Sequence, residues 1–150
     1  MSIRGYLLGE SSMACPYISG NSATNEQLVI ESLDDSDLEG LLASGYRHFG
    51  NYFFRPVCSL CHKCLPLRIP VADYRASSSA RRTLGRSARF LVTLERPHPT
   101  SEAHALYLKH KKRFAEPPGG PSEESYDDFV GTFFHPFPFA YQLSIFDGKR

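Results

Sequence analysis

Three cysteines at two-residue intervals are the feature that most constrains this 150-residue chain. Cys58, Cys61 and Cys64 form the pattern C-x-x-C-x-x-C, and Cys15 stands apart near the N-terminus. Two intervening residues place successive thiolates within reach of one metal centre. Four thiolates complete a site for zinc or for an iron–sulfur cluster, and the triple spacing is more typical of a [4Fe–4S] cluster. The sequence therefore predicts a four-cysteine site made of Cys15, Cys58, Cys61 and Cys64.

Two other interpretations of the cysteines stay open, namely reduced thiols that bind nothing and a redox pair. Disulfides are disfavoured because the N-terminal apolar stretch is too short for a signal peptide, which favours a reducing compartment. The sequence also has no apolar run near the ~20 residues that a membrane helix needs. We therefore expect a cytoplasmic protein without a membrane partner.

Positive charge is concentrated in the middle of the chain, although the formal net charge is only +1. Residues 75–113 hold ten Lys and Arg against two Asp and Glu, a net of +8, between two acidic flanks. Guanidinium groups such as those of Arg81 and Arg82 bind phosphate bidentately, and serine hydroxyls near a helix start favour the same ligand. A local field of this kind attracts polyanions even where the total charge is near zero. The segment predicts an RNA-backbone surface; the alternative is a solvated charged face.

Aromatic side chains accompany the basic segment. Tyr74, Phe90 and Tyr107 are candidates to stack on unpaired bases, although aromatics at such spacing are more often part of a core. The sequence contains no nucleophile motif, P-loop or dinucleotide fingerprint, so we expect no nucleotide cofactor and identify no catalytic residue.

The periodicity of apolar residues predicts a mixture of helices and strands, an α+β fold. Helices are expected over residues 26–32, 36–45, 77–84, 101–114 and 125–131, and strands over 67–71, 90–95 and 139–146. Residues 1–24 are expected to be irregular, and residues 116–122 to form a loop. Ser36 and Glu39 form a capping-box pattern that predicts the start of a helix, and Gly45 predicts its end. The aromatic stretch 46–55 predicts a hairpin with its turn at Gly50 and Asn51.

The end of the sequence carries a turn signal without a following strand. Asp147 and Gly148 after an apolar strand are typical of a hairpin, yet only Lys149 and Arg150 follow. We therefore expect the chain to be an interrupted part of a larger protein. The alternative is that the strand over 139–146 pairs elsewhere.

Several ordered motifs carry a resemblance to a known family. The stretches S-G-Y-R-H-F-G-N at 44–51, R-P-x-C-x-x-C-x-x-C-x-P-x-R-I-x-V at 55–71 and S-x-S-x-R-R at 77–82 resemble the arginyl-tRNA–protein transferase family. Its bacterial branch contains the aspartate/glutamate leucyltransferases. The residues Cys15-Pro16-Tyr17-Ile18 resemble the early cysteine motif of the family, and Leu106-Tyr107 resemble its later helix.

The resemblance implies an aminoacyltransferase. Leucine or arginine would move from leucyl- or arginyl-tRNA to the α-amino group of a protein that begins with Asp or Glu, which marks that protein for N-degron degradation. An N-terminal cysteine-containing domain over 1–99 would precede an acetyltransferase-like (GNAT-type) α/β domain, incomplete over 100–150. The residues expected to bind tRNA or substrate are Arg75, Ser79, Arg81, Arg82 and Tyr107.

The sequence departs from the family pattern at a few positions. Ala80 stands where the family usually has Gln, His110 where it has Tyr, and Phe114-Ala115 where it commonly has Arg-His. These positions bear on the recognition of tRNA or of the acceptor protein. The alternative function is a non-catalytic metal- or Fe–S-binding module that binds RNA or senses redox state.

Overall fold

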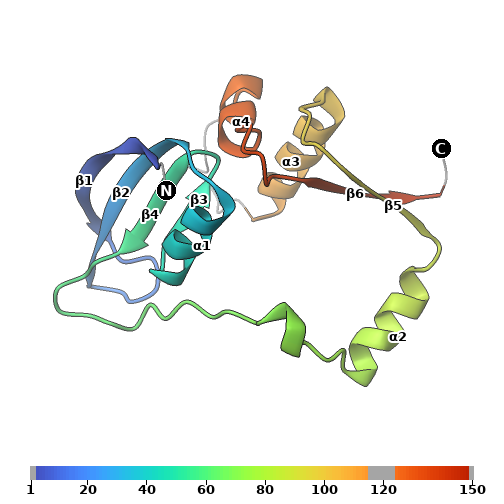
Figure 1. Cartoon of the computed structure of the whole chain (residues 1–150), viewed down its shortest axis with the longest axis horizontal. Helices are drawn as coiled ribbons and strands as arrows, with labels where there is room; N and C mark the ends of the chain where they lie inside the picture. Colours follow the sequence, from blue (N-terminus) through green and yellow to red (C-terminus); the bar gives the residue numbers. More distant parts are fainter. Residues whose placement is uncertain (1–2, 115–123, 149–150) are drawn as a thin grey trace. The chain divides into compact units, whose positions relative to one another are not determined.

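The computed structural model describes residues 3–114 and 124–148, which contain both helices and antiparallel strands (Figure 1). In chain order the elements are β1 (Arg4–Ala14), β2 (Ser22–Ser32), α1 (Asp35–Ala43), β3 (Arg47–Phe49), β4 (Tyr52–Pro56), the 3₁₀ turn η1 (Val71–Asp73), α2 (Ser78–Ser87), β5 (Phe90–Glu95), α3 (Ser101–Phe114), α4 (Tyr126–Phe133) and β6 (Gln142–Asp147). This content agrees with the expected α+β class. Among the helices of the described residues, none has the length and apolar character needed to cross a membrane.

Contacts divide the chain into two compact units. The first comprises Met1–Cys64 and His98–Phe139, and the second comprises Leu65–Pro97 and Ala140–Arg150. The expected domain division at residue 99 stays a prediction, and the expected loop at 116–122 falls outside the described residues.

The first unit is built on a four-stranded antiparallel sheet with the strand order β1-β2-β4-β3. The sheet is seen in blue to green in Figure 1. Strands β3 and β4 form the predicted aromatic hairpin, in which Phe49 pairs with Tyr52. Gly50 occupies the turn with φ +53°, a conformation that glycine adopts without steric cost. The hairpin prediction is therefore confirmed.

The core of the first unit lies on one face of this sheet. Phe53 in β4 is fully buried, and Ile30 in β2 is 2% exposed. The Phe53 ring stacks on His48 at a centroid distance of 4.7 Å and meets the edge of Phe137 at 6.4 Å. Phe137 follows α4, so the chain after α4 returns to the sheet and contributes to the same core.

Helix α1 is capped two residues earlier than the predicted capping box, which begins at Ser36. The cap is Asp34, whose carboxylate accepts a hydrogen bond from the Asp37 backbone N–H at 2.8 Å, and Ser36 donates its hydroxyl to the same oxygen at 2.7 Å. Asp is as strong a cap as Ser, and here it lies closer to the end of β2. Gly45 follows the helix with φ +86°, as the sequence predicts.

Two predictions about the N-terminal region are wrong. The sequence predicts an irregular segment over 1–24 and a helix over 26–32, but β1 and β2 form a long antiparallel ladder over Arg4–Ala14 and Ser22–Ser32. The half-buried Leu28 and the buried Ile30 are two residues apart, which fits one face of a strand. Pairing with β1 and β4, distant in sequence, overrides the local helical pattern.

The second unit contains α2 and the two-stranded antiparallel sheet of β5 and β6. The predicted strand over 90–95 is confirmed, and the strand expected over 139–146 is found at Gln142–Asp147, with β5 as its partner. The strand expected over 67–71 is wrong, because only the turn η1 forms in this stretch. Pro66 and Pro70 lack the N–H groups that a ladder needs.

Candidate functional site

Helix α2 carries the predicted phosphate-binding residues on an exposed surface. Ser77 caps the helix by accepting a hydrogen bond from the Ala80 backbone N–H at 3.1 Å, which explains why the serine run begins a helix. Arg81 and Arg82 are exposed, and the Arg81 guanidinium lies 3.4 Å from the Ser78 hydroxyl. No residue of α2 is buried, so its cations face solvent and are available to a charged ligand.

Arg75 and Ser79 differ in what they contact. The Arg75 Nη1 group donates to the carbonyl oxygens of Ala72 and Tyr74 at 3.0 and 3.1 Å, so this arginine stabilises the turn η1. Ser79 lies exposed in the first turn of α2. The predicted residues Arg75, Ser79, Arg81 and Arg82 thus gather in one stretch of the second unit.

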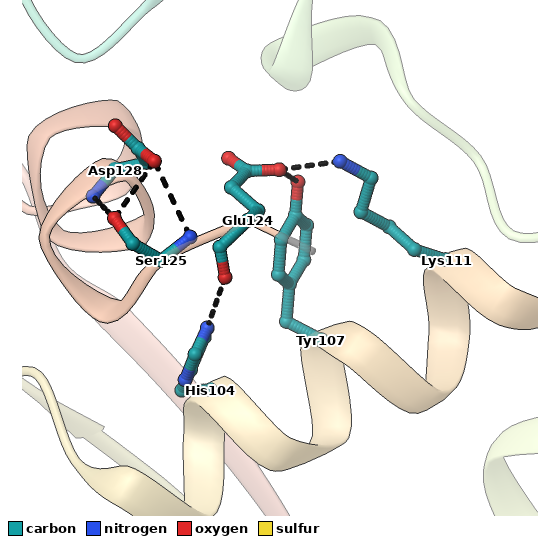
Figure 2. Close-up of polar contacts among 6 residues, drawn as sticks. All are labelled: His104, Tyr107, Lys111, Glu124, Ser125 and Asp128. Carbon is teal, nitrogen blue, oxygen red and sulfur yellow. Dashed lines mark hydrogen bonds and ion pairs between the residues drawn. The ribbon is translucent and has the colours of Figure 1, made fainter. Parts of the chain in front are cut away.

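Tyr107, the remaining predicted residue, belongs to the first unit and to a polar network around Glu124 (Figure 2). Its hydroxyl donates to the Glu124 carboxylate oxygen Oε2 at 2.7 Å. The Lys111 ammonium forms an ion pair and hydrogen bond with the same oxygen. Because Tyr107 and Lys111 are four residues apart on α3, both side chains project from one face of that helix. We call Tyr107, Lys111 and Glu124 the Glu124 network.

The members of the Glu124 network shift one another's pKa. The pKa of Glu124 lies below its ordinary value, first because Lys111 and then because Tyr107 hydrogen-bonds its charged form. The pKa of Tyr107 is raised by burial and by the hydrogen bond that its proton makes to Glu124. The pKa of Lys111 is raised, mainly by its hydrogen bond to Glu124. At neutral pH the network therefore holds a carboxylate, an ammonium and a protonated phenol, which suits it to joining helices better than to removing a proton.

The start of α4 is tied to α3 through the same region. His104 Nε2 lies 3.0 Å from the backbone carbonyl oxygen of Glu124, and the His104 ring contacts that of Phe129 at 5.2 Å. Ser125 and Asp128 form a reciprocal capping box at the first turn of α4, visible at the left of Figure 2. The sequence predicts this helix, but it does not identify Glu124, because its partners on α3 are 13 or more residues away in the sequence.

A second network of similar composition lies on the four-stranded sheet. The Glu26 carboxylate accepts hydrogen bonds from the Tyr46 hydroxyl and, at 2.8 Å, from Arg55 Nε. The Arg55 guanidinium also lies 4.7 Å from the centroid of the Tyr46 ring and 3.4 Å from the Ser44 carbonyl oxygen. Tyr46 hydrogen-bonding is the first cause of the lowered pKa of Glu26. Tyr46 and Arg55 belong to the motifs that carry the family resemblance, and their structural partner is Glu26.

The cysteines lie toward one end of the same sheet. The Cys58 thiol is 3.4 Å from the backbone nitrogen of Thr24 in β2, and the Cys15 N–H donates to the Asn21 carbonyl oxygen at 2.8 Å. These positions follow β4 and β1, whose C-terminal ends both pair with the start of β2. All four cysteines are half-buried and free of disulfides.

The arrangement of the thiols does not fit a complete metal site. Within the described residues, no group of three or more His, Cys, Asp or Glu side chains is placed to hold a metal ion. Cys58, Cys61 and Cys64 are nevertheless half-buried, whereas the residues between them, Ser59, Leu60, His62 and Lys63, are exposed. The four-cysteine site with zinc or a [4Fe–4S] cluster therefore stays a prediction of the sequence.

Comparisons with known proteins match the part of the chain that contains the motifs of the family resemblance. Residues 13–82 match the family model described as "Arginine-tRNA-protein transferase, N terminus". A protein of Shewanella sp. (strain MR-4), named aspartate/glutamate leucyltransferase, is 31% identical over 141 residues, which cover 91% of this chain and 56% of the relative. A protein of the same name from Campylobacter jejuni subsp. jejuni serotype O:6 is 37% identical over 102 residues, or 68% of this chain and 42% of the relative.

The chain thus spans about half the length of the curated relatives that it matches. Its matched region includes the cysteines, the hairpin and the arginines at the start of α2. The chain therefore belongs to the arginyl-tRNA–protein transferase family, in the bacterial branch of the aspartate/glutamate leucyltransferases.

Proposed function

We propose that the protein is an aminoacyl-tRNA–protein transferase that moves leucine from leucyl-tRNA to the N-terminal Asp or Glu of an acceptor protein. The observation that carries this proposal is the 31% identity, over 91% of this chain, to a relative named for that activity. Arginyl-tRNA is the alternative donor, because the matching family model is named for arginine.

The proposed reaction is aminolysis of an activated ester. The neutral α-amino nitrogen attacks the ester carbonyl carbon, a C–N bond forms, and the C–O bond to the ribose breaks. The ribose oxygen leaves and takes up a proton, while the attacking nitrogen loses one. Because the α-ammonium group has a pKa of about 8, part of it is already neutral near pH 7. Positioning of the two substrates then supplies much of the rate.

Both substrates of this reaction are anionic at the points that must be held. The tRNA presents phosphates, and the acceptor presents a carboxylate on its first residue. The exposed cations Arg81 and Arg82, with Arg75 and Ser79 beside them, suit either ligand. Because binding to phosphates releases counterions, tRNA affinity through this surface would fall with salt.

The broader role follows the same reasoning. Transfer of leucine to an acidic N-terminus would mark the acceptor for degradation in the N-degron pathway. A cytoplasmic location is proposed, since charged tRNA is used where proteins are made. Residues 100–150 are proposed as the beginning of an acetyltransferase-like domain that contains the reaction centre.

The decisive experiment supplies the full-length protein with radiolabelled leucyl-tRNA or arginyl-tRNA and with peptides that differ only in their first residue. Label should move from leucyl-tRNA to peptides that begin with Asp or Glu, and peptides that begin with Ala should stay unlabelled. Transfer from arginyl-tRNA alone would show that the donor is arginyl-tRNA and not leucyl-tRNA. Absence of transfer from both tRNAs would favour the non-catalytic RNA-binding module.

A further inference from the structure

The register of the four-stranded sheet assigns its residues to two faces. Residues directly opposite one another share a face, and successive residues alternate. Leu28, Phe53 and His48 are opposite one another across β2, β4 and β3, and Phe53 belongs to the core. Val29 and its partner Tyr52 therefore lie on the other face of the sheet.

This other face carries a row of aromatic side chains. Tyr52 lies opposite Phe49, and the Phe54 ring stacks beside both, at centroid distances of 5.7 and 6.0 Å. The ring planes differ by only 26° and 18°, so the three rings are nearly parallel. Tyr6 extends the row onto β1, where it pairs with Val29. We call Tyr6, Phe49, Tyr52 and Phe54 the aromatic face.

The aromatic face is accessible. Tyr6 is 55% exposed and Phe49 is 54% exposed, and Tyr52 and Phe54 are half-buried. Adjacent exposed apolar side chains of this size on a folded domain usually mark a binding site. Rigid aromatic rings on a sheet offer flat surfaces on which planar ligands can stack.

The polar residues of this face indicate the chemistry of the ligand. Gln27 pairs with Phe54 and donates a hydrogen bond to Ser11, and Arg47 pairs with Phe54 from the other side. Asn25 is two residues before Gln27 in β2 and therefore lies on the same face. At the paired positions of these four strands, every carboxylate, that of Glu10 or of Glu26, lies on the opposite face.

We propose that the aromatic face binds unpaired RNA nucleotides, and, given the proposed function, that its ligand is the single-stranded 3′ end of the tRNA. Bases stack on aromatic rings, amide side chains hydrogen-bond base edges, and Arg47 attracts the phosphates. The paired positions of this face carry Arg47 and two amides but no carboxylate, so they do not repel a polyanion; Glu31 lies outside the paired positions. Phe49, which is 54% exposed and stacks against Phe54, is the principal stacking residue.

The test compares two fluorescein-labelled RNA hairpins, one blunt and one with a short unpaired 3′ tail, by fluorescence anisotropy. The wild-type protein should bind the tailed hairpin more tightly. Phe49→Ala should weaken binding to the tailed hairpin on the order of tenfold, to the level of the blunt one, because a stacking platform is lost. Tyr141→Ala, which removes a similarly exposed ring (58%) from the second unit, should change neither affinity.

Two conservative variants separate stacking from apolar docking. Phe49→Trp keeps a ring and should keep the preference for the tail, whereas Phe49→Leu keeps apolar area without a ring and should lose it. Equal wild-type affinity for both hairpins, or full tail binding by Phe49→Leu, overturns the proposal and favours a protein ligand on this face. This test is independent of the proposed transferase function, because the preference for the tail is measured on RNA that carries no amino acid and needs no transfer of leucine.

Discussion

Tyr107 and Lys111 converge on the same carboxylate oxygen of Glu124, so that one turn of α3 holds the residue that precedes the cap of α4 (Figure 2). The link joins α3 to the residue before α4 within the first unit. An acidic residue shared by a phenol and an ammonium therefore links α3 to the start of α4, beside the His104 contact with the Glu124 backbone.

Replacing Glu124 with glutamine should destabilise the protein by about 1 kcal/mol, because an amide cannot form the ion pair with Lys111 and accepts a weaker hydrogen bond from Tyr107. Urea unfolding followed by circular dichroism measures the change in the free energy of unfolding. Glu95→Gln, which changes an exposed carboxylate on β5, should alter stability far less. Equal effects of the two substitutions would show that the network contributes nothing to stability.

The stability contributed by Glu124 should depend on pH. The pKa of Glu124 is lowered from 4.5, so its contribution is present above that unfolded value and is lost as the pH falls through the lower folded value. The pKa values of Lys111 and Tyr107 are raised, so their contribution is present below about pH 10 and is lost as the pH rises through the folded values. The difference in unfolding free energy between wild type and Glu124→Gln should be constant from about pH 5 to 9 and shrink at both extremes. A difference that does not vary with pH would contradict the assigned ionisation states.

Arg55→Lys should lower the stability of the four-stranded sheet by about 1 kcal/mol. A lysine keeps the charge but cannot maintain both the Nε hydrogen bond to Glu26 and the stacking of a planar guanidinium on Tyr46. Thermal unfolding provides the measurement, with Arg47→Lys as the control, since Arg47 is exposed on the adjacent strand β3. Matching melting temperatures for the two variants would mean that the charge alone matters at Arg55.

The elements predicted best from the sequence are those whose pattern is local. The helix over Ser101–Phe114 and the strand over Phe90–Glu95 agree with the structure at both ends, because each has a clear apolar period. The local pattern does not predict strands β1 and β2, because their stability comes from pairing with one another and with β4. The turn of the aromatic hairpin was found because Gly50 marks it directly.

The site residues divide in the same way. The arginines of α2 are visible in the sequence as a run of cations, and their exposure follows from a helix without buried residues. The sequence does not reveal Glu124 as a site residue, because its partners Tyr107 and Lys111 lie on α3, distant in sequence. The aromatic face also escaped prediction, since the positions of Tyr6 and Phe54 on one face depend on strand register, which no local pattern specifies.

Removal of the two arginines of α2 should weaken tRNA binding. The double variant Arg81→Ala, Arg82→Ala loses about two phosphate contacts, so the slope of log affinity against log salt should become shallower by about 1.8. Nitrocellulose filter binding over a series of salt concentrations measures this slope. Lys63→Ala, which removes an exposed cation of the first unit, should leave the slope unchanged. An unaltered slope in the double variant would show that these arginines of the basic segment are solvated and do not bind tRNA.

The four cysteines should bind zinc or iron when the protein is purified without oxygen. The three cysteines that follow β4 are half-buried between exposed neighbours, and Cys15 and Cys58 both lie toward the same end of the sheet. Elemental analysis and absorption spectra distinguish the two metals, because an iron–sulfur cluster is coloured and zinc is not. Cys58→Ser should remove the metal, whereas Ser59→Ala, an adjacent exposed change, should retain it. Metal-free protein with four freely reactive thiols would refute the site and leave the cysteines as reduced, half-buried side chains.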